Sequence, residues 1–142
     1  MNTSDVATAS TKIHAPASRV WEALTNPELI KQYFFNTEVV SDWKVGSSIL
    51  YRGEWQGKPF EDKGKILEME PEKLLVSTHW SPLSGVPDLP ENYHTVTYRL
   101  EESNGSTEVT ISQDKNASVE EKDHSEANWK AVLDGMKKLL EG

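Results

Sequence analysis

The sequence predicts an α+β fold in which a curved antiparallel sheet wraps around one long C-terminal helix. Residues Ser118 to Leu140 form this predicted helix, because Ser118 suits an N-cap and Glu121 follows three residues later as in a capping box. A run of strand-like segments precedes the helix, and a sheet with one apolar face needs a cover. The apolar stripe expected to face the sheet recurs at helical spacing and consists of Trp129, Val132, Leu133, Met136, Leu139 and Leu140.

The first third of the chain is predicted to form one short strand and two short helices. The strand covers Val6 to Ile13. The first helix covers Ala17 to Leu24, with Pro16 next to its start. Pro27 ends this helix and opens the second one, Glu28 to Tyr33, because the residue before a proline disfavours helical backbone angles.

Six more strands are predicted between these helices and the C-terminal helix. Asn104-Gly105 marks the last hairpin, since this pair readily takes the positive φ angles of a tight turn. Gly64 predicts a bulge or bend within a strand. In the strand 73–80, the alternation places the even-numbered residues, Thr78 and Trp80 among them, on the face toward the helix. The six ranges are 37–43, 48–55, 60–69, 73–80, 93–101 and 106–113.

A loop is predicted from Ser81 to Asn92, because three prolines and Gly85 fall within this segment. Its apolar residues between the prolines allow two interpretations. The loop is either a lid over the mouth of a cavity or a segment packed against the short helices.

Composition limits the class of protein. A chain of 142 residues suits one domain, expected to span residues 1–142. A net charge of −8 argues against nucleic acid or an anionic membrane as the main partner. The absence of cysteine excludes disulfides, thiol catalysis and cysteine-based zinc sites. Neither a signal peptide nor a membrane-length apolar run is recognised, so a cytoplasmic location is expected.

The segment Ile13 to Thr25, IHAPASRVWEALT, resembles the opening motif of the START-like (SRPBCC) superfamily. More narrowly, the chain resembles the family named for the activator of the heat-shock-protein-90 ATPase, from about residue 6 onward. The segments that carry this second resemblance are NPELIKQY at 26–33, WKVGS at 43–47, GKILE at 64–68, PEKL at 71–74, STEVTI at 106–111, and Trp129.

The resemblance implies the helix-grip fold of the birch-pollen allergen and a hollow domain able to hold a ligand. It also implies a chaperone partner, which is known for eukaryotic members that carry an additional domain. Some relatives in the superfamily cyclise or hydrate polyketide-like substrates with polar residues inside the cavity. One fold hosts many functions, so the resemblance specifies the architecture more strongly than the activity.

No metal site, catalytic residue or cofactor is predicted. No two of the four histidines are spaced as ligands on one face of a helix or strand. His79 and His94 lie on neighbouring strands, but an inward Trp80 would turn His79 to the opposite face. A Gly-x-Ser-x-Gly elbow and a glycine-rich phosphate loop are also absent from the sequence.

Aromatic residues on the inward strand faces predict the wall of an apolar cavity. His94 beside Tyr98 is the one arrangement suited to proton shuttling, although the simpler expectation is that they satisfy each other or the adjacent loop. The predicted ligand-binding residues are Tyr51, Trp55, Thr78, Trp80, His94, Val96, Tyr98, Trp129, Leu133 and Met136.

The leading functional hypothesis is a cytosolic binding module, a monomer or weak homodimer, that holds an apolar or aromatic small molecule between sheet and helix. One alternative is an interaction protein that binds a chaperone through its surface. Another is a cavity enzyme of cyclase or hydrolase type, for which His94 would be the titrating group. The binder needs a cavity, the chaperone partner needs an exposed patch, and the enzyme needs a buried titrating side chain.

Overall fold

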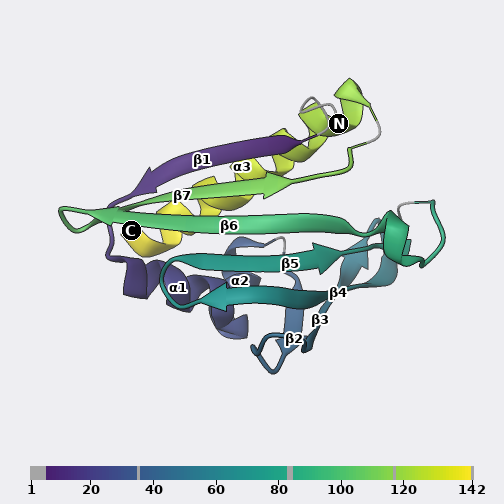
Figure 1. Cartoon of the computed structure of the whole chain (residues 1–142), viewed down its shortest axis with the longest axis horizontal. Helices are drawn as coiled ribbons and strands as arrows, with labels where there is room; N and C mark the ends of the chain where they lie inside the picture. The colour runs from purple at the N-terminus through teal and green to yellow at the C-terminus, as the bar shows by residue number, and fades with distance from the viewer. Residues whose placement is uncertain (1–5, 35, 83–84, 117, 142) are drawn as a thin grey trace.

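A computed structural model describes residues 6–34, 36–82, 85–116 and 118–141. In this part of the chain, seven strands form one antiparallel sheet in the order β1-β7-β6-β5-β4-β3-β2 (Figure 1). The helix-grip α+β fold is confirmed. The elements are β1 (Ala7–Ile13), α1 (Ala17–Thr25), α2 (Pro27–Tyr33), β2 (Glu38–Ser41), β3 (Ser48–Trp55), β4 (Lys58–Glu70), β5 (Leu74–His79), η3 (Pro90–Asn92), β6 (His94–Ser103), β7 (Ser106–Gln113) and α3 (Val119–Glu141).

The two short helices begin where the prolines predict. At the start of α1, the carboxylate of Glu102 accepts a hydrogen bond from the Ala17 amide at 2.7 Å. At the start of α2, Asn26 Oδ1 accepts from the Glu28 amide at 3.0 Å, and Pro27 occupies the first helical turn. Each carbonyl or carboxylate acceptor satisfies an amide that a helix leaves unpaired at its N-terminus.

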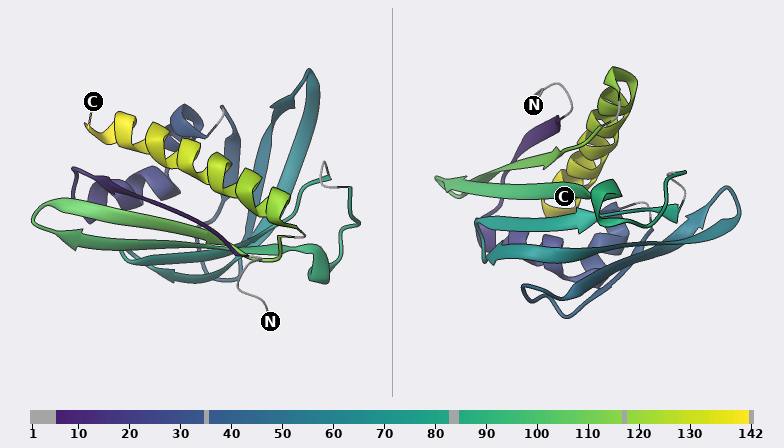
Figure 2. Two further views of the ribbon diagram at one scale, coloured as in Figure 1. Left: turned by 90° about the horizontal axis from the view of Figure 1, so that it is seen from above. Right: turned by 45° about the vertical axis from the view of Figure 1, so that its right-hand side comes forward.

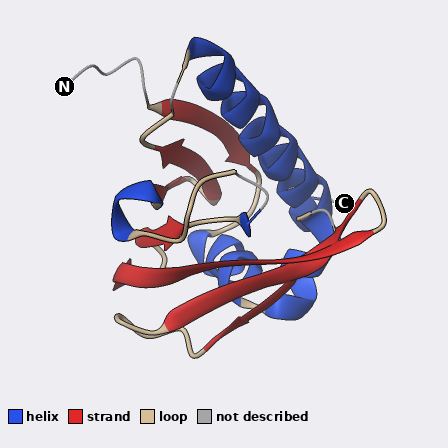
Figure 3. Cartoon of the chain, turned by 90° about the vertical axis from the view of Figure 1, so that its right-hand side faces the viewer, coloured by secondary structure: helices blue, strands red, loops and turns tan. Residues whose placement is uncertain are grey.

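The long helix α3 lies on one side of the curved sheet together with α1 and α2 (Figures 2 and 3). Its predicted N-cap is confirmed, since the Glu121 amide donates to Ser118 Oγ at 3.1 Å. The face of α3 toward the sheet is buried at Val132, Leu133, Met136 and Leu140. This burial removes the apolar stripe from water and fixes α3 on the sheet.

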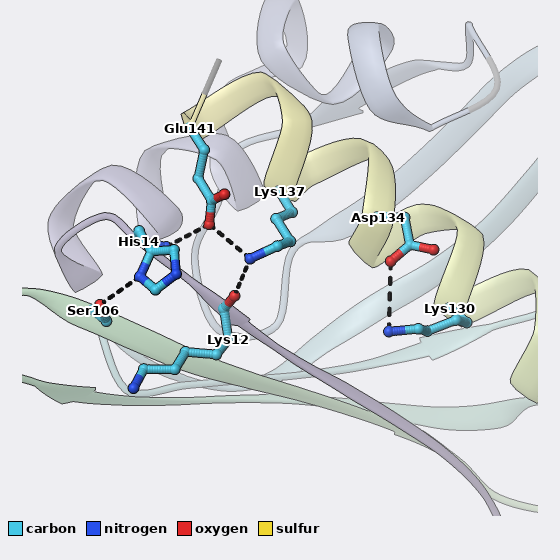
Figure 4. A network of polar contacts seen from close by, with 7 residues as sticks. All are labelled: Lys12, His14, Ser106, Lys130, Asp134, Lys137 and Glu141. Atoms are coloured by element: carbon cyan, nitrogen blue, oxygen red, sulfur yellow. Dashed lines mark hydrogen bonds and ion pairs between the residues drawn. The ribbon is translucent and has the colours of Figure 1, made fainter.

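The C-terminal end of α3 is hydrogen-bonded to the end of β1 and to the residue that follows it (Figure 4). Glu141 Oε2 accepts from the His14 amide at 2.7 Å and from Lys137 Nζ at 2.8 Å. Lys137 Nζ also donates to the Lys12 carbonyl at 2.6 Å. The hydrogen bond from Lys137 holds the pKa of the Glu141 carboxyl below its ordinary value.

The bend predicted at Gly64 has two parts. A Cβ at Gly64 would lie 1.7 Å from the carbonyl oxygen of Thr78, so only glycine allows β4 and β5 to approach this closely. The pairing of β4 with β5 then shifts register between Ile66 and Glu68. A register shift of this kind bends the strand and increases its twist.

The facing predicted for β5 is wrong. Leu75 and Ser77 point into the core, with 3% and 2% of their surface exposed. Thr78 is on the opposite face, where its Oγ1 accepts from the Lys65 amide at 3.0 Å. Val76, on the other face, is also buried, at 7% exposed, so burial along β5 does not follow the alternation of the strand and its apolar pattern carries no clear period.

The predicted loop is confirmed where it is described, and Leu83 and Ser84 lie outside the described residues. Asp88 anchors the loop, because it pairs with Lys63 and accepts from Tyr93 Oη at 2.6 Å. Trp80 Nε1 donates to the Val86 carbonyl at 3.2 Å. The apolar side chains of Val86 and Leu89 are exposed, so this part of the loop does not pack on the short helices.

Candidate functional site

A pocket of about 250 Å³, here called the main pocket, lies between the sheet and α3. Strands β3 to β7 supply one wall, α3 supplies another, and the residue after α2 closes one side. Its lining residues are Phe34, Tyr51, Asp62, His79, Ser81, His94, Val96, Tyr98, Gln113, Ser125, Asn128, Trp129 and Val132.

Aromatic rings form one wall of the main pocket. Phe34 stacks on Tyr51 with ring centroids 6.1 Å apart, and meets Trp129 edge-on at 5.9 Å. Trp129 also meets Tyr98 edge-on at 6.0 Å. Edge-to-face and offset contacts of this length fix ring positions, so the wall presents rigid apolar surface to the pocket.

A second, narrow pocket of about 20 Å³ continues from the main pocket into the core. The two share four lining residues, namely Phe34, Tyr51, Tyr98 and Val132. Its volume suits a single molecule of water size. These four residues therefore mark the inner limit of the space available to a ligand.

The tyrosine hydroxyls of this region are buried. Burial raises the pKa of Tyr33, Tyr51 and Tyr98 well above the ordinary value, because the phenolate form loses its hydration. Tyr33 Oη donates to the Ala23 carbonyl at 2.7 Å. These hydroxyls are neutral hydrogen-bonding groups rather than bases.

Asp62, His79 and His94 form a polar part of the main-pocket lining, here called the polar side. Asp62 Oδ2 lies 3.0 Å from His79 Nε2, while Asp62 Oδ1 is buried and has no hydrogen-bond partner among the described residues. A buried acceptor left without a donor costs about 1–3 kcal/mol, more when it is charged. An unsatisfied group of this kind in a pocket wall is typical of functional sites rather than of a core selected for stability alone.

The two histidines of the pocket come from neighbouring strands. His79 of β5 and His94 of β6 are direct partners in the antiparallel register, so their side chains share one face. The expectation that they differ in facing is therefore wrong. His94 Nδ1 lies 2.7 Å from the Asp114 carbonyl oxygen, which makes the backbone its partner rather than Tyr98.

A hydrogen-bonded chain of side chains holds α3 to β7 beside the pocket. Trp129 Nε1 donates to Gln113 Oε1 at 2.9 Å, and Gln113 Nε2 donates to Ser125 Oγ at 3.4 Å. Ser125 Oγ donates in turn to Asn116 Oδ1 at 2.9 Å. The indole of Trp129 is thus fixed by its nitrogen as well as by its ring contacts.

The structure brings together part of the predicted set. Tyr51, His94, Val96, Tyr98 and Trp129 line the main pocket. Met136 lines the narrow pocket, and Leu133 is fully buried in the core without lining either. Thr78 and Trp80 line neither pocket, and the side chain of Trp55 lies outside the described part of the structure.

Several residues that line the main pocket were not predicted from the sequence. His79 was missed because its role depends on the facing of β5, which the apolar pattern of that strand does not define. Asp62 lies on β4, and its contact with His79 depends on how β4 and β5 align. The hairpin register does not find them, because counting back from the Asn104-Gly105 turn fixes the pairing of β6 with β7 but leaves the pairing of β6 with β5 open.

Two absences hold for the described residues. No three histidine, cysteine, aspartate or glutamate side chains among them are grouped so as to hold a metal ion. None of the helices they form is long and apolar enough to cross a membrane.

A curved sheet closed by a long C-terminal helix, with a pocket between them, defines a START-like domain. Residues 14–141 match the family described as Activator of Hsp90 ATPase homolog 1-like protein, and the chain belongs to that family. A comparison with curated protein sequences finds no match.

Solved structures agree with this assignment. The solution structure of ChR145 from Cytophaga hutchinsonii is 53% identical, with a TM-score of 0.84 over 96% of this chain and 93% of that one. The Aha1 dimer from Colwellia psychrerythraea is 20% identical, with a TM-score of 0.73 over 95% of each chain. DynU16, from the dynemicin biosynthetic locus, is 20% identical, with a TM-score of 0.80 over 96% of this chain and 47% of that one. The last two likenesses show the fold alone.

Proposed function

We propose that this protein is a small cytoplasmic binding module that holds an apolar or aromatic small molecule in the main pocket without covalent chemistry. The observation that carries the proposal is the aromatic wall of Phe34, Tyr51, Tyr98 and Trp129 around a space of about 250 Å³. Ligand sites are typically concave, with mostly apolar walls and a few placed polar groups.

The volume of the main pocket limits the size of the ligand. An apolar cavity of about 150 Å³ accommodates benzene in a protein core. A space of about 250 Å³ therefore suits one ring with a short substituent. A larger ligand would extend past the rim of the pocket, where Asn128 is exposed on α3.

Thermal unfolding with a panel of one-ring and two-ring aromatic compounds tests the proposal. A ligand at one hundred times its dissociation constant stabilises a protein by roughly 2.7 kcal/mol, which raises Tm by several degrees. Asn128→Phe should fill the rim and abolish the shift. The matched control is Lys130→Phe, an exposed position on the same helix that lines neither pocket.

Two results would oppose the binding module. One is the absence of a shift with every compound in the panel. The other is a shift that survives Asn128→Phe and is lost in Lys130→Phe, since it would place the ligand outside the main pocket.

The second candidate function is a chaperone-interacting protein, and the observation that favours it is membership of the family itself. This function would use the surface and not the main pocket. Adding the protein to an Hsp90-type chaperone and measuring ATP hydrolysis tests it, with Asn128→Phe expected to be as effective as the unsubstituted protein. An unchanged rate of hydrolysis would oppose this candidate.

A further inference from the structure

We propose that the polar side of the main pocket, formed by Asp62, His79 and His94, binds the ammonium group of a small aromatic amine. This inference rests on the proposed function, because it names the chemical class of ligand for the same pocket.

The polar side presents acceptors. An ionised Asp62 only accepts hydrogen bonds, so the 3.0 Å contact with Oδ2 assigns the proton of His79 to Nε2 and leaves Nδ1 as an acceptor. The Asp114 carbonyl likewise assigns the proton of His94 to Nδ1 and leaves Nε2 as an acceptor. His79 and His94 thus each keep one acceptor nitrogen on the pocket lining, and Asp62 adds a carboxylate whose Oδ1 is buried without a donor, so a cationic ligand that supplies several donors would complement this side.

The charge of Asp62 has no cationic partner in the pocket. Among the described lining residues there is no lysine or arginine. Strand alternation turns Lys63 and Arg52, the sequence neighbours of Asp62 and Tyr51, to the opposite face, where Lys63 pairs with Asp88 and Arg52 pairs with Glu61. The chain as a whole carries a net charge of −8, which raises the local concentration of cations rather than anions.

The aromatic wall strengthens the preference for a cation. Tyr51 meets His79 edge-on at 5.4 Å and stacks on Phe34, so the ring wall and the polar side are in direct contact. Ammonium groups are attracted to the faces of tryptophan, tyrosine and phenylalanine. A neutral alcohol would satisfy an acceptor but leave the carboxylate charge uncompensated, and a carboxylate would be repelled.

Three probes of similar size distinguish these cases: 2-phenylethylamine, 2-phenylethanol and phenylacetate. Each has one ring and a short chain, which suits a pocket of about 250 Å³. Isothermal titration at about pH 8, above the range in which an imidazole ordinarily takes up a proton, should give the amine at least about tenfold tighter binding than the alcohol, and no binding of phenylacetate.

Asp62→Asn should weaken binding of the amine by about tenfold or more and leave the alcohol within about threefold, because the substitution removes charge at nearly constant size. The matched control is Asp134→Asn, an exposed carboxylate on α3 outside the pocket. That variant should bind all three probes as the unsubstituted protein does.

The outcomes separate this inference from the proposed function. If the unsubstituted protein bound the alcohol or phenylacetate as tightly as the amine, or more tightly, the inference of an amine ligand would be overturned. The proposed binding module would stand. If a folded Asp62→Asn protein bound the amine as tightly as the unsubstituted protein, the inference of an amine ligand would also be overturned. If none of the three probes bound, the inference of an amine ligand would be overturned, and the result would also count against the proposed binding module.

Discussion

His79 and His94 are direct cross-strand partners in the β5–β6 ladder, yet each contacts its polar partner through a different ring nitrogen, Nε2 in His79 and Nδ1 in His94. The partner of His79 is a carboxylate on β4, and the partner of His94 is the backbone carbonyl that follows β7. The group that hydrogen-bonds to one imidazole nitrogen decides which of the two nitrogens is left to bind a ligand.

This relationship predicts the tautomers of both rings. At about pH 8, long-range ¹⁵N–¹H spectra should show His79 protonated on Nε2 and His94 protonated on Nδ1. Asp62→Asn should alter the pattern of His79 only, because Asp62 hydrogen-bonds to His79 whereas His94 hydrogen-bonds to the Asp114 carbonyl. The same tautomer at both rings, or a change at His94 instead, would contradict the arrangement.

The close approach at Gly64 predicts a large effect of a small substitution. Gly64→Ala should lower the free energy of unfolding by about 3 kcal/mol or more, since the added Cβ would lie 1.7 Å from a backbone oxygen that cannot move alone. Urea unfolding measures the change. Lys65→Ala, at the next and exposed position, should stay within about 0.5 kcal/mol. Equal midpoints for the two variants would show that β4 and β5 are further apart.

The buried hydroxyls predict a steep loss of stability in alkali. Each buried tyrosine has a folded pKa above its ordinary value of 10.0, so above pH 10 the unfolded chain releases protons that the folded chain keeps. Stability is complete below pH 10 and falls as pH rises toward the folded pKa, by up to about 1.4 kcal/mol per pH unit for each tyrosine.

Absorbance of tyrosinate measures this effect. Tyr93 differs from the other three, because partial burial and its hydrogen bond to Asp88 raise its pKa only to about 12. We expect no tyrosine to ionise near pH 10, and ionisation of Tyr33, Tyr51 and Tyr98 only together with unfolding. A tyrosine among these three that titrates near pH 10 in the folded protein would show that it is accessible to water.

The contacts of Glu141 at the C-terminal end of α3 predict a loss of stability in acid. The pKa of Glu141 is lowered from 4.5 by Lys137, so the carboxylate stabilises the fold above pH 4.5 and this contribution is lost as pH falls through the folded pKa. Glu141→Gln should lower Tm slightly at neutral pH and have no effect near pH 2. The control is Glu108→Gln, an exposed position on β7. A difference between Glu141→Gln and the unsubstituted protein that persists in strong acid would contradict the ionic origin of this contribution.

Much of the fold could be predicted because local signals were strong. Prolines and caps defined the helices, and the Asn104-Gly105 turn with its regular alternation defined β6 and β7, in which Tyr98 and Ile111 are buried. The facing of β5 could not be predicted, since Leu75 and Val76 are both buried and an apolar run has no period.

Only part of the candidate site could be predicted, because the facing of its residues was clear only on strands with regular alternation. Residues on strands with clear alternation, such as Tyr51 and Tyr98, line the main pocket. Asp62 and His79 depend on how β4, β5 and β6 align, and register between strands is set by long-range packing that one sequence does not display.

The most direct test of the binding module is the response of the five tryptophan indole N–H signals to a saturating aromatic ligand in ¹⁵N–¹H spectra. Trp129 donates its indole hydrogen bond beside the main pocket, whereas Trp80 donates to the loop on the opposite face. We predict that the Trp129 signal shifts and the Trp80 signal does not. A shift of Trp80 with Trp129 unmoved would contradict a ligand site between the sheet and α3.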